Sequence, residues 1–412
     1  MTKEKSTVPR LRFPGFTDAW KQRKLGEVAT FAKGNGYSKK DLVIEGSPII
    51  LYGRLYTKYE TVISEVDTFV SVEDNKNSVV YSEGGEILVP ASGESSLDIA
   101  RASVVAKKGI ILGGDINIIR LHSEIFPVFL ALTISNGKQQ KGLSKRAQGK
   151  SVVHLHNSDL KKVDLDFPTL PEQEAIGSFF SDLDQLITLH QRKLDDVKEL
   201  KKALLQKMFP KGNGNDFPEL RFPKFTDAWK QRKLGEVLKE RNESRSPSAD
   251  VPLVSFTVEN GVTPKTERYN REFLVRDEDK KYKFTQLDDI VYNPANLKFG
   301  AIARNKYGAA VFSPIYVTYG VLSEAHPLFV ELIVTSTNFI QRALRYQEGT
   351  VYERMAVKSF DLLRSEILLP TLPEQEAIGS FFSDLDQLIT LHQRQLDHLK
   401  LLKKALLQQM FI

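Results

Sequence analysis

Apolar side chains recur at spacings of three and four along residues 169–209, and the same pattern returns along residues 371–411. Each copy opens with a proline and a Glu-Gln-Glu run, which suits the positive end of a helix dipole. Each copy predicts one continuous helix of about 37 residues, roughly 55 Å long at 1.5 Å per residue. The predicted apolar seams consist of Ile176, Phe180, Leu183, Ile187 and Leu194, and of Ile378, Phe382, Leu385, Ile389 and Leu396.

The two helical segments are nearly identical, because they differ at only five positions. A helix with an apolar seam cannot cover that seam alone, and the same chain contains an equivalent helix that can. We therefore expect the two helices to pair as a coiled-coil-like spacer. His190 and His392 occupy equivalent places in the two seams.

A second duplication precedes the bodies of the chain. Residues 9–28 read PRLRFPGFTDAWKQRKLGEV, and residues 218–237 read PELRFPKFTDAWKQRKLGEV; we call these segments the arms. The chain is thus two tandem units, each with an arm, a variable body and a long helix. The joint at residues 210–217 is too short to carry the chain back along the first helix. The helices are therefore expected to be antiparallel, with one body at each end and an approximate two-fold axis between them.

The two bodies contain short apolar runs separated by turn residues. The first body is expected to have strands at residues 48–52, 86–90, 102–106 and 109–112, and a helix near residues 127–134. The second body repeats this order in different residues, at 252–256, 289–294 and 327–332. The predicted fold class is α+β, with two pseudo-two-fold-related globular domains separated by a pair of long antiparallel coiled-coil-like helices.

The expected domain boundaries follow from the same repeats. They are residues 1–167 for the first arm and body, 168–210 for the first spacer helix, 211–369 for the linker, second arm and second body, and 370–412 for the second spacer helix.

Composition narrows the class of protein. The 412 residues are 41% hydrophobic and 27% charged, which is ordinary for a globular chain. There is no cysteine, which excludes disulfides and thiolate metal sites. No apolar run is long enough for a membrane span and the first residues lack a signal-peptide core, so a cytoplasmic location without a membrane partner is expected. A net charge of +6 and a pI near 9.0 are compatible with a nucleic-acid partner.

Basic residues interleaved with amides, hydroxyls and aromatic rings gather at one place in each body. Lysine and arginine contact phosphates, whereas amides and hydroxyls read base edges. The candidate DNA-binding residues of the first body are Tyr52, Arg54, Lys58, Lys141, Lys145, Arg146, Gln148, Lys150 and Ser151. Those of the second body are Arg268, Arg271, Arg342, Arg345, Gln347, Thr350 and Arg354. One such residue alone is an ordinary solvated charge, but the recurrence of the cluster indicates double-stranded DNA.

Three motifs resemble catalytic sites and are incomplete. Residues 144–151 resemble a phosphate-binding loop, but Ser144 stands in place of its first glycine. Residues 31–36 and 293–296 resemble the short motifs of adenine methyltransferases. The first has the wrong spacing, and the second lacks the aromatic residue that stacks on a flipped base. We therefore expect neither catalytic residues nor a metal site in this chain.

The complete layout resembles the specificity subunits of Type I restriction-modification systems. The resemblance is carried by the duplicated Pro-Glu-Gln-Glu-Ala-Ile helix starts, by the arms that end in Lys-Leu-Gly-Glu-Val, and by the Gln-Gly-Lys-Ser and Gln-Glu-Gly-Thr stretches before the helices. It covers nearly all of residues 9–412. It implies target-recognition domains that select a bipartite, asymmetric DNA site, in a subunit without catalysis or a cofactor of its own. It also implies docking of two methyltransferase (modification) subunits, which bring S-adenosylmethionine, and of restriction/translocase subunits, which use ATP and Mg.

Two other classes stay open from the residues alone. A stand-alone DNA methyltransferase would bind S-adenosylmethionine as an isolated chain. A tandem-repeat scaffold without a nucleic-acid role would give no sequence-selective gel shift.

Overall fold

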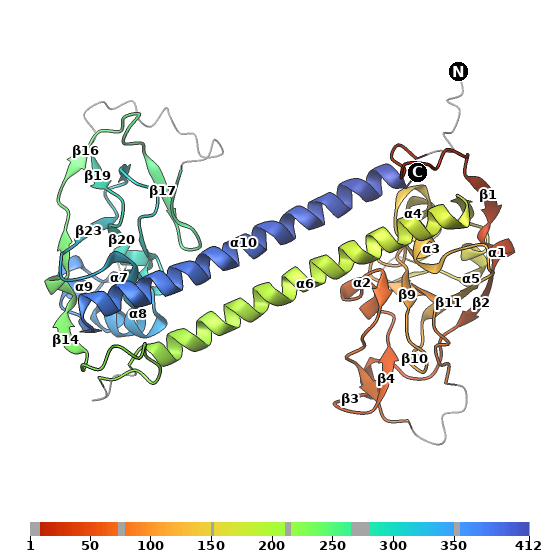
Figure 1. The fold of residues 1–412 in the computed structure, drawn as a ribbon, viewed down its shortest axis with the longest axis horizontal. Coiled ribbons are helices and arrows are strands. Elements are labelled where there is room, and N and C mark those ends of the chain that lie inside the picture. Colours follow the sequence, from red (N-terminus) through yellow and green to blue (C-terminus); the bar gives the residue numbers. More distant parts are fainter. Residues whose placement is uncertain are drawn as a thin grey trace. The chain divides into compact units, whose positions relative to one another are not determined.

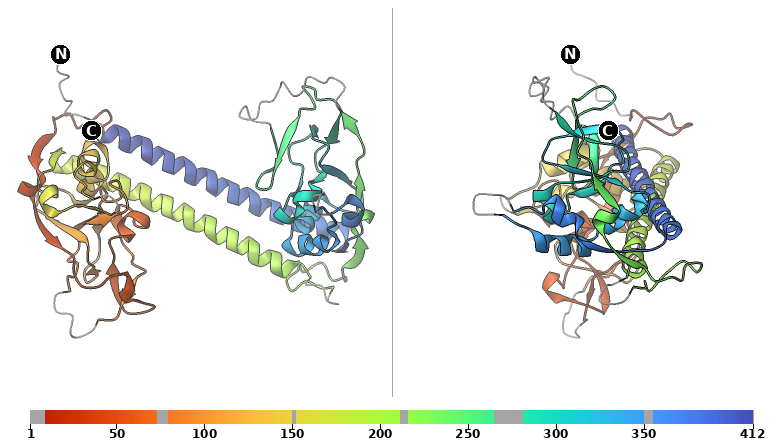
Figure 2. Two further views of the ribbon diagram at one scale, coloured as in Figure 1. Left: turned by 180° about the vertical axis from the view of Figure 1, so that it is seen from behind. Right: turned by 90° about the vertical axis from the view of Figure 1, so that its left-hand side faces the viewer.

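The computed structural model describes residues 9–72, 79–149, 152–210, 216–264, 281–349 and 355–411. The chain divides into two compact units (Figures 1 and 2). Unit 1 contains Met1–Lys193 and His392–Ile412, and unit 2 contains Leu194–Leu391. The mixture of helices and short strands confirms the α+β class.

The two predicted long helices are α6 (Leu170–Met208) and α10 (Leu372–Met410), each 39 residues long. Both are slightly longer than the repeated apolar pattern predicts. Each contributes its two halves to different units. In the part of the chain that the structure describes, no helix combines the length and the apolar character needed to cross a membrane.

The helices pair antiparallel within each unit (Figure 1). In unit 1, Phe180 near the start of α6 lies 6.2 Å, between ring centroids, from Phe411 just after α10. In unit 2, Phe209 just after α6 lies 6.4 Å from Phe382 near the start of α10. This confirms the antiparallel direction that the short joint predicts.

The seam contains both apolar and charged contacts. Of the ten seam residues named from the sequence, eight are buried, and Leu385 and Ile389 are half-buried. His190 and His392 meet in the seam with 3.4 Å between their Nδ1 atoms. Two equivalent ion pairs cross between the helices, Lys403 with Asp184 in unit 1 and Lys201 with Asp386 in unit 2. Burial raises the pKa of the Asp184 carboxyl, and the adjacent Lys403 ammonium opposes that shift.

The body of unit 1 is built on a five-stranded sheet with the order β2-β11-β7-β9-β5. Its strands are β2 (Ala29–Lys33), β11 (Ile116–Leu121), β7 (Ile87–Pro90), β9 (Ser103–Val105) and β5 (Val62–Ile63). The central strand β7 is buried throughout, which explains its unbroken apolar sequence. A second sheet has the order β10 (Ile111–Leu112), β4 (Ser47–Ile50), β6 (Phe69–Val70) and β3 (Leu42–Val43).

The body of unit 2 repeats the main sheet of unit 1. Strands β15 (Leu238–Glu240), β23 (Val317–Val321), β20 (Ile290–Tyr292) and β21 (Ile302–Arg304) have the order of β2-β11-β7-β9, with the same antiparallel neighbours. The outer strands differ: β16 (Ser244–Arg245), β19 (Tyr282–Thr285) and β22 (Ala310–Phe312) form one sheet, and β17 (Val254–Thr257) pairs with β18 (Gly261–Pro264). The two bodies thus share the strand order of the main sheet and differ in their outer strands.

Two short helices follow the main sheet in each body. They are α3 (Pro127–Ile134) and α4 (Gly137–Ser144) in unit 1, and α7 (Pro327–Val334) and α8 (Thr337–Ala343) in unit 2. In Figure 1, α3 and α4 lie beside the first turns of α6, and α7 and α8 lie beside the first turns of α10. A 3-10 turn, η6 (Leu344–Tyr346), continues α8. The next short helices are α5 (Asn157–Leu160) and α9 (Ser359–Leu363).

Each arm joins its body to the start of the long helix. Strand β1 (Lys21–Lys24) pairs with β13 (Asp164–Phe167), and β14 (Lys230–Lys233) pairs with β24 (Glu366–Leu369). The arm tryptophans, Trp20 and Trp229, pack edge-on against Phe129 of α3 and Phe329 of α7, at 5.6 Å in both units. These aromatic clusters tie the arm, the body and the helix ends of one unit together.

The Glu-Gln-Glu run has a second role that the helix-dipole argument missed. Glu172 is buried and accepts two hydrogen bonds from the Arg12 guanidinium, at 2.7 and 2.6 Å. Glu374 accepts the same pair from Arg221, at 2.7 Å each. The neighbouring Gln173 accepts from the Phe126 backbone N–H and donates to the Glu124 and Pro168 carbonyl oxygens. The helix start therefore binds both the arm and the body.

Candidate nucleic-acid interface

The basic segment of the first body begins on α4. Lys141 lies on this helix, Lys145 and Arg146 follow its last turn, and Gln148 comes next; all four side chains are exposed. Among the residues that the structure describes, none of the three cations has an acidic partner. Their positive charges are therefore available to an external anion.

The segment then turns back on itself in a tight backbone bridge. Gln148 and His154 exchange backbone hydrogen bonds of 3.1 and 2.8 Å. Gly149 has φ +126°, and a Cβ atom there would lie 2.0 Å from the Val152 carbonyl oxygen, so only glycine fits. Strand β12 (Val153–His154) pairs with β8 (Ser92–Gly93), where the Ser92 hydroxyl lies 3.0 Å from His154 Nδ1. The two ends of the predicted contact loop are thus fixed; Lys150 and Ser151 lie outside the described residues.

The second body carries a corresponding segment. Arg342 lies on α8 and Arg345 on η6; both are exposed, and Gln347 is half-buried. Neither arginine has an acidic partner in the described ranges. Glu348 and Ala356 exchange backbone hydrogen bonds as Gln148 and His154 do in unit 1. Thr350 and Arg354 fall outside the described residues.

The side chains at equivalent places in these segments differ. Lys141 corresponds to Gln341, Arg146 to Tyr346 and Gln148 to Glu348. In unit 2 the Tyr346 ring also stacks with the Arg364 guanidinium, whose carbon lies 4.4 Å from the ring centroid. The segments around the two backbone bridges therefore present different hydrogen-bonding groups in the two bodies.

The other candidate DNA-binding residues of the first body are Tyr52, Arg54 and Lys58, and their positive charge is partly neutralised. Tyr52 is half-buried and packs against the sheet core, and Arg54 begins the short helix α2 (Arg54–Thr57). Arg54 and Lys58 both pair with Asp67, and the Lys58 hydrogen bond holds the pKa of that carboxyl below its usual value. Among the described residues, no hydrogen bond or ion pair joins Tyr52, Arg54 or Lys58 to the α4 segment. Arg268 and Arg271 lie outside the described residues.

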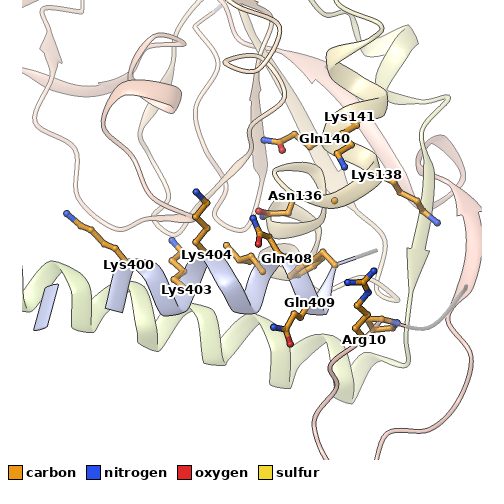
Figure 3. A pocket seen from close by; sticks show the side chains of 14 residues that line it. Arg10, Asn136, Lys138, Gln140, Lys141, Lys400, Lys403, Lys404, Gln408 and Gln409 are labelled. Atoms are coloured by element: carbon orange, nitrogen blue, oxygen red, sulfur yellow. The ribbon is translucent and has the colours of Figure 1, made fainter. Parts of the chain in front are cut away.

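A basic cleft of about 830 Å³ opens between α4, the end of α10 and the first arm in unit 1 (Figure 3). Its basic lining residues are Arg10, Lys138, Lys141, Lys400, Lys403 and Lys404, and its amide lining residues are Asn136, Gln140, Gln408 and Gln409. The arm is fixed at the cleft because the Arg10 and Leu11 N–H groups both donate to the Gln409 carbonyl oxygen. The sequence did not indicate Arg10, Lys400 and Lys404 as candidate DNA-binding residues, because the cleft is formed by three segments that lie far apart along the chain.

The incomplete catalytic motifs have structural explanations. The Asn293 side chain accepts from the Ala295 N–H and caps a 3-10 turn, η5 (Pro294–Phe299). Ser144 ends α4 and donates to the Ser96 hydroxyl. Within the described ranges, no group of three or more acidic, histidine or cysteine side chains is placed to hold a metal ion.

Comparison with known proteins finds similarity to type I restriction enzyme specificity proteins. Residues 17–199 match the family described as Type I restriction modification DNA specificity domain. The putative type I restriction enzyme MjaX specificity subunit of Methanocaldococcus jannaschii is 23% identical, over 94% of this chain and 92% of its own length. The MjaVIII specificity subunit of the same organism is 21% identical, over 96% and 92%.

One solved structure shows the same fold over the whole chain. The crystal structure of a type I restriction-modification S subunit from M. genitalium superposes with a TM-score of 0.64 at 15% identity. The match covers 98% of this chain and 99% of that one.

Proposed function

Since this chain belongs with the type I restriction-modification DNA specificity proteins, we propose that it selects a bipartite, asymmetric site on double-stranded DNA, one half for each body. The observation that supports this proposal is that the two bodies share one backbone fold and carry different side chains on it. Both bodies build the same sheet order and the same bridged segment, yet they present different side chains there. Two bodies with the same fold and different exposed side chains should recognise two different half-sites.

The chemistry of each segment fits a division of labour between affinity and specificity. Lys141, Lys145 and Arg146 in unit 1, and Arg342 and Arg345 in unit 2, provide exposed positive charge for phosphates. The side chains around the backbone bridges supply amide and hydroxyl groups, which hydrogen-bond to base edges in the major groove. The bridges hold these groups on a fixed backbone, which lowers the entropic cost of ordering them on DNA.

The duplicated helices support the docking of two copies of one partner, the modification subunit. Leu186 and Leu189 of α6 are exposed, and so are the identical Leu388 and Leu391 of α10. Exposed apolar residues at the same place in two equivalent segments fit two equivalent partner surfaces. Restriction/translocase subunits complete the assembly.

Catalysis and cofactors reside on those partners in this proposal. S-adenosylmethionine belongs to the modification subunits, ATP and Mg to the restriction subunits, and the complex works in the cytoplasm. The chain supplies the choice of site and no catalytic group.

The test is methylation mapping in a host that lacks other restriction-modification systems. The chain is expressed together with type I modification subunits, and the positions of methylated bases are read across the genome. The expected result is one motif with two different short half-sites and a non-specific gap of fixed length. A single uninterrupted motif would overturn the bipartite proposal, and methylation by the chain alone would overturn the non-catalytic one.

A further inference from the structure

The basic cleft of unit 1 contains more positive charge than the fold requires. Lys403 is committed to a structural role, since it pairs with Asp184 of α6 and with Glu60 of the body. Lys138 pairs with Asp166 of β13. Arg10, Lys141, Lys400 and Lys404 have no acidic partner within the described part of the chain. Four uncompensated cations therefore share one concave surface.

Compensation of the helix dipole does not explain these cations. The dipole of a helix favours cations only within about its last turn of 3.6 residues. Lys404 and Lys400 precede Met410, the last residue of α10, by about two and three turns. Lys141 and Arg10 lie on other segments. These four positive charges are thus available to an anion outside the chain.

The second unit provides an internal comparison, because its helix end has the same lysines. Lys198 and Lys202 of α6 correspond to Lys400 and Lys404 of α10. The opposite wall differs: the counterparts of Arg10, Lys138 and Lys141 are Glu219, Asn338 and Gln341. Lys207 in place of Gln409 restores only one positive charge. The strong accumulation of charge belongs to unit 1.

We infer that this cleft binds the DNA phosphate backbone beside the half-site read by unit 1, as an anchor that unit 2 lacks. The inference rests on the proposed function and adds the C-terminal turns of α10 to the DNA-binding surface. Lys141 belongs both to the cleft and to the exposed α4 segment, so one phosphate track can run from Lys145 and Arg146 toward Lys404 and Lys400. Figure 3 shows the lysines of α10 and those of α4 on facing sides of the cleft. The Gln408 and Gln409 amides of the lining suit phosphate oxygens as hydrogen-bond donors, whereas the Asn136 and Gln140 amides already donate to the Leu132 and Ala100 carbonyl oxygens.

The test compares two matched double variants of the full chain, each purified with the modification subunits. Lys400→Gln/Lys404→Gln removes exposed charge from the cleft, and Lys198→Gln/Lys202→Gln removes it from the equivalent place in unit 2. Binding to a duplex with the methylated motif, and to an unrelated duplex of equal length, is measured between about 50 and 300 mM salt. Because each phosphate contact contributes about 0.9 to the slope of log K against log salt, the cleft variant should lower the slope by about 1.8 on both duplexes. The control variant should lower it by less than half as much.

Each outcome decides between the alternatives. Equal effects of the two variants, or an unchanged slope in the cleft variant, would overturn the inference. A cleft variant that loses a modification subunit but keeps its salt slope would show that the cleft docks an acidic protein segment instead. If the unaltered complex fails to distinguish the two duplexes, the proposed function fails, and the slopes on the unrelated duplex still decide the role of the cleft. Equal unfolding midpoints of the variants and the unaltered chain exclude misfolding.

Discussion

Loss of the arginine that joins the arm to the long helix should destabilise one unit strongly. Arg12 holds Glu172 in unit 1, and Arg221 holds Glu374 in unit 2, each through two hydrogen bonds. The glutamate side chains are 1% and 0% exposed, so removal of the arginine leaves a buried carboxylate without its counter-ion. Breaking a buried pair from one side costs about 3–5 kcal/mol, whereas an exposed pair contributes less than about 1 kcal/mol.

The structure also ranks the two substitutions. Glu374 keeps a second donor after Arg221→Ala, because Trp229 Nε1 donates to it at 3.3 Å. Among the described residues, Glu172 has no side-chain donor other than Arg12. Arg12→Ala should therefore lower the stability of unit 1 at least as much as Arg221→Ala lowers that of unit 2. The position of both carboxylates in the first turn of a helix offsets up to about 1 kcal/mol of the cost. About 3 kcal/mol is the expected loss for Arg12→Ala.

The two tryptophans of the chain make each unit separately measurable. Trp20 is buried in unit 1 and Trp229 in unit 2, so a Trp→Phe substitution at one of them leaves fluorescence that reports on the other unit. With urea slopes of about 1–3 kcal/mol per M, a loss of 3 kcal/mol moves the unfolding midpoint by about 1 M or more. Arg12→Ala should move the Trp20 transition by that amount and the Trp229 transition less. A shift of the Trp20 transition below about 0.3 M would refute the assigned role of the buried pair.

Three further outcomes are expected. Lys141→Ala/Lys145→Ala should weaken specific and non-specific DNA binding alike and lower the salt slope by about 1.8; an unchanged slope would show that this segment faces away from DNA. Gly379→Ala should destabilise unit 2 in a Trp229 fluorescence titration although alanine favours helices, because its Cβ would lie 2.7 Å from Leu328 Cβ; a gain in stability would contradict this steric argument. Insertion of four residues in the middle of both α6 and α10 lengthens each helix by about 6 Å. Methylation mapping should then show the same half-sites with a gap longer by about one or two base pairs, and altered half-sites at an unchanged gap would refute the spacer role.

The long helices and the main strands were predictable because their signals are local. Spacings of three and four over 39 residues leave little choice but a helix, and the duplication identifies its partner. The buried strand β7 shows as an unbroken apolar run between turn residues. The short joint, together with the expected pairing of the two helices, was enough to predict the antiparallel direction.

The roles of single polar residues were not predictable in the same way. Glu172 satisfies the rule for acids in a first helical turn, and nothing local shows that it is buried against Arg12, 160 residues away in the sequence. Arg54 and Lys58 match a phosphate-binding run, yet both pair with Asp67. The basic cleft combines residues of an arm, of α4 and of α10, so it exists only once the chain is folded.

Exchange of one body inside the intact chain tests the assignment of one half-site to each body. Body 1, residues 29–167, replaces body 2, residues 238–369, and the arms and long helices are kept. Methylation mapping of the resulting complex should yield a symmetric motif in which the unit 1 half-site occurs twice, inverted, around a gap of unchanged length. A motif that still contains the original second half-site, or a loss of sequence preference in a complex that assembles normally, would contradict that assignment.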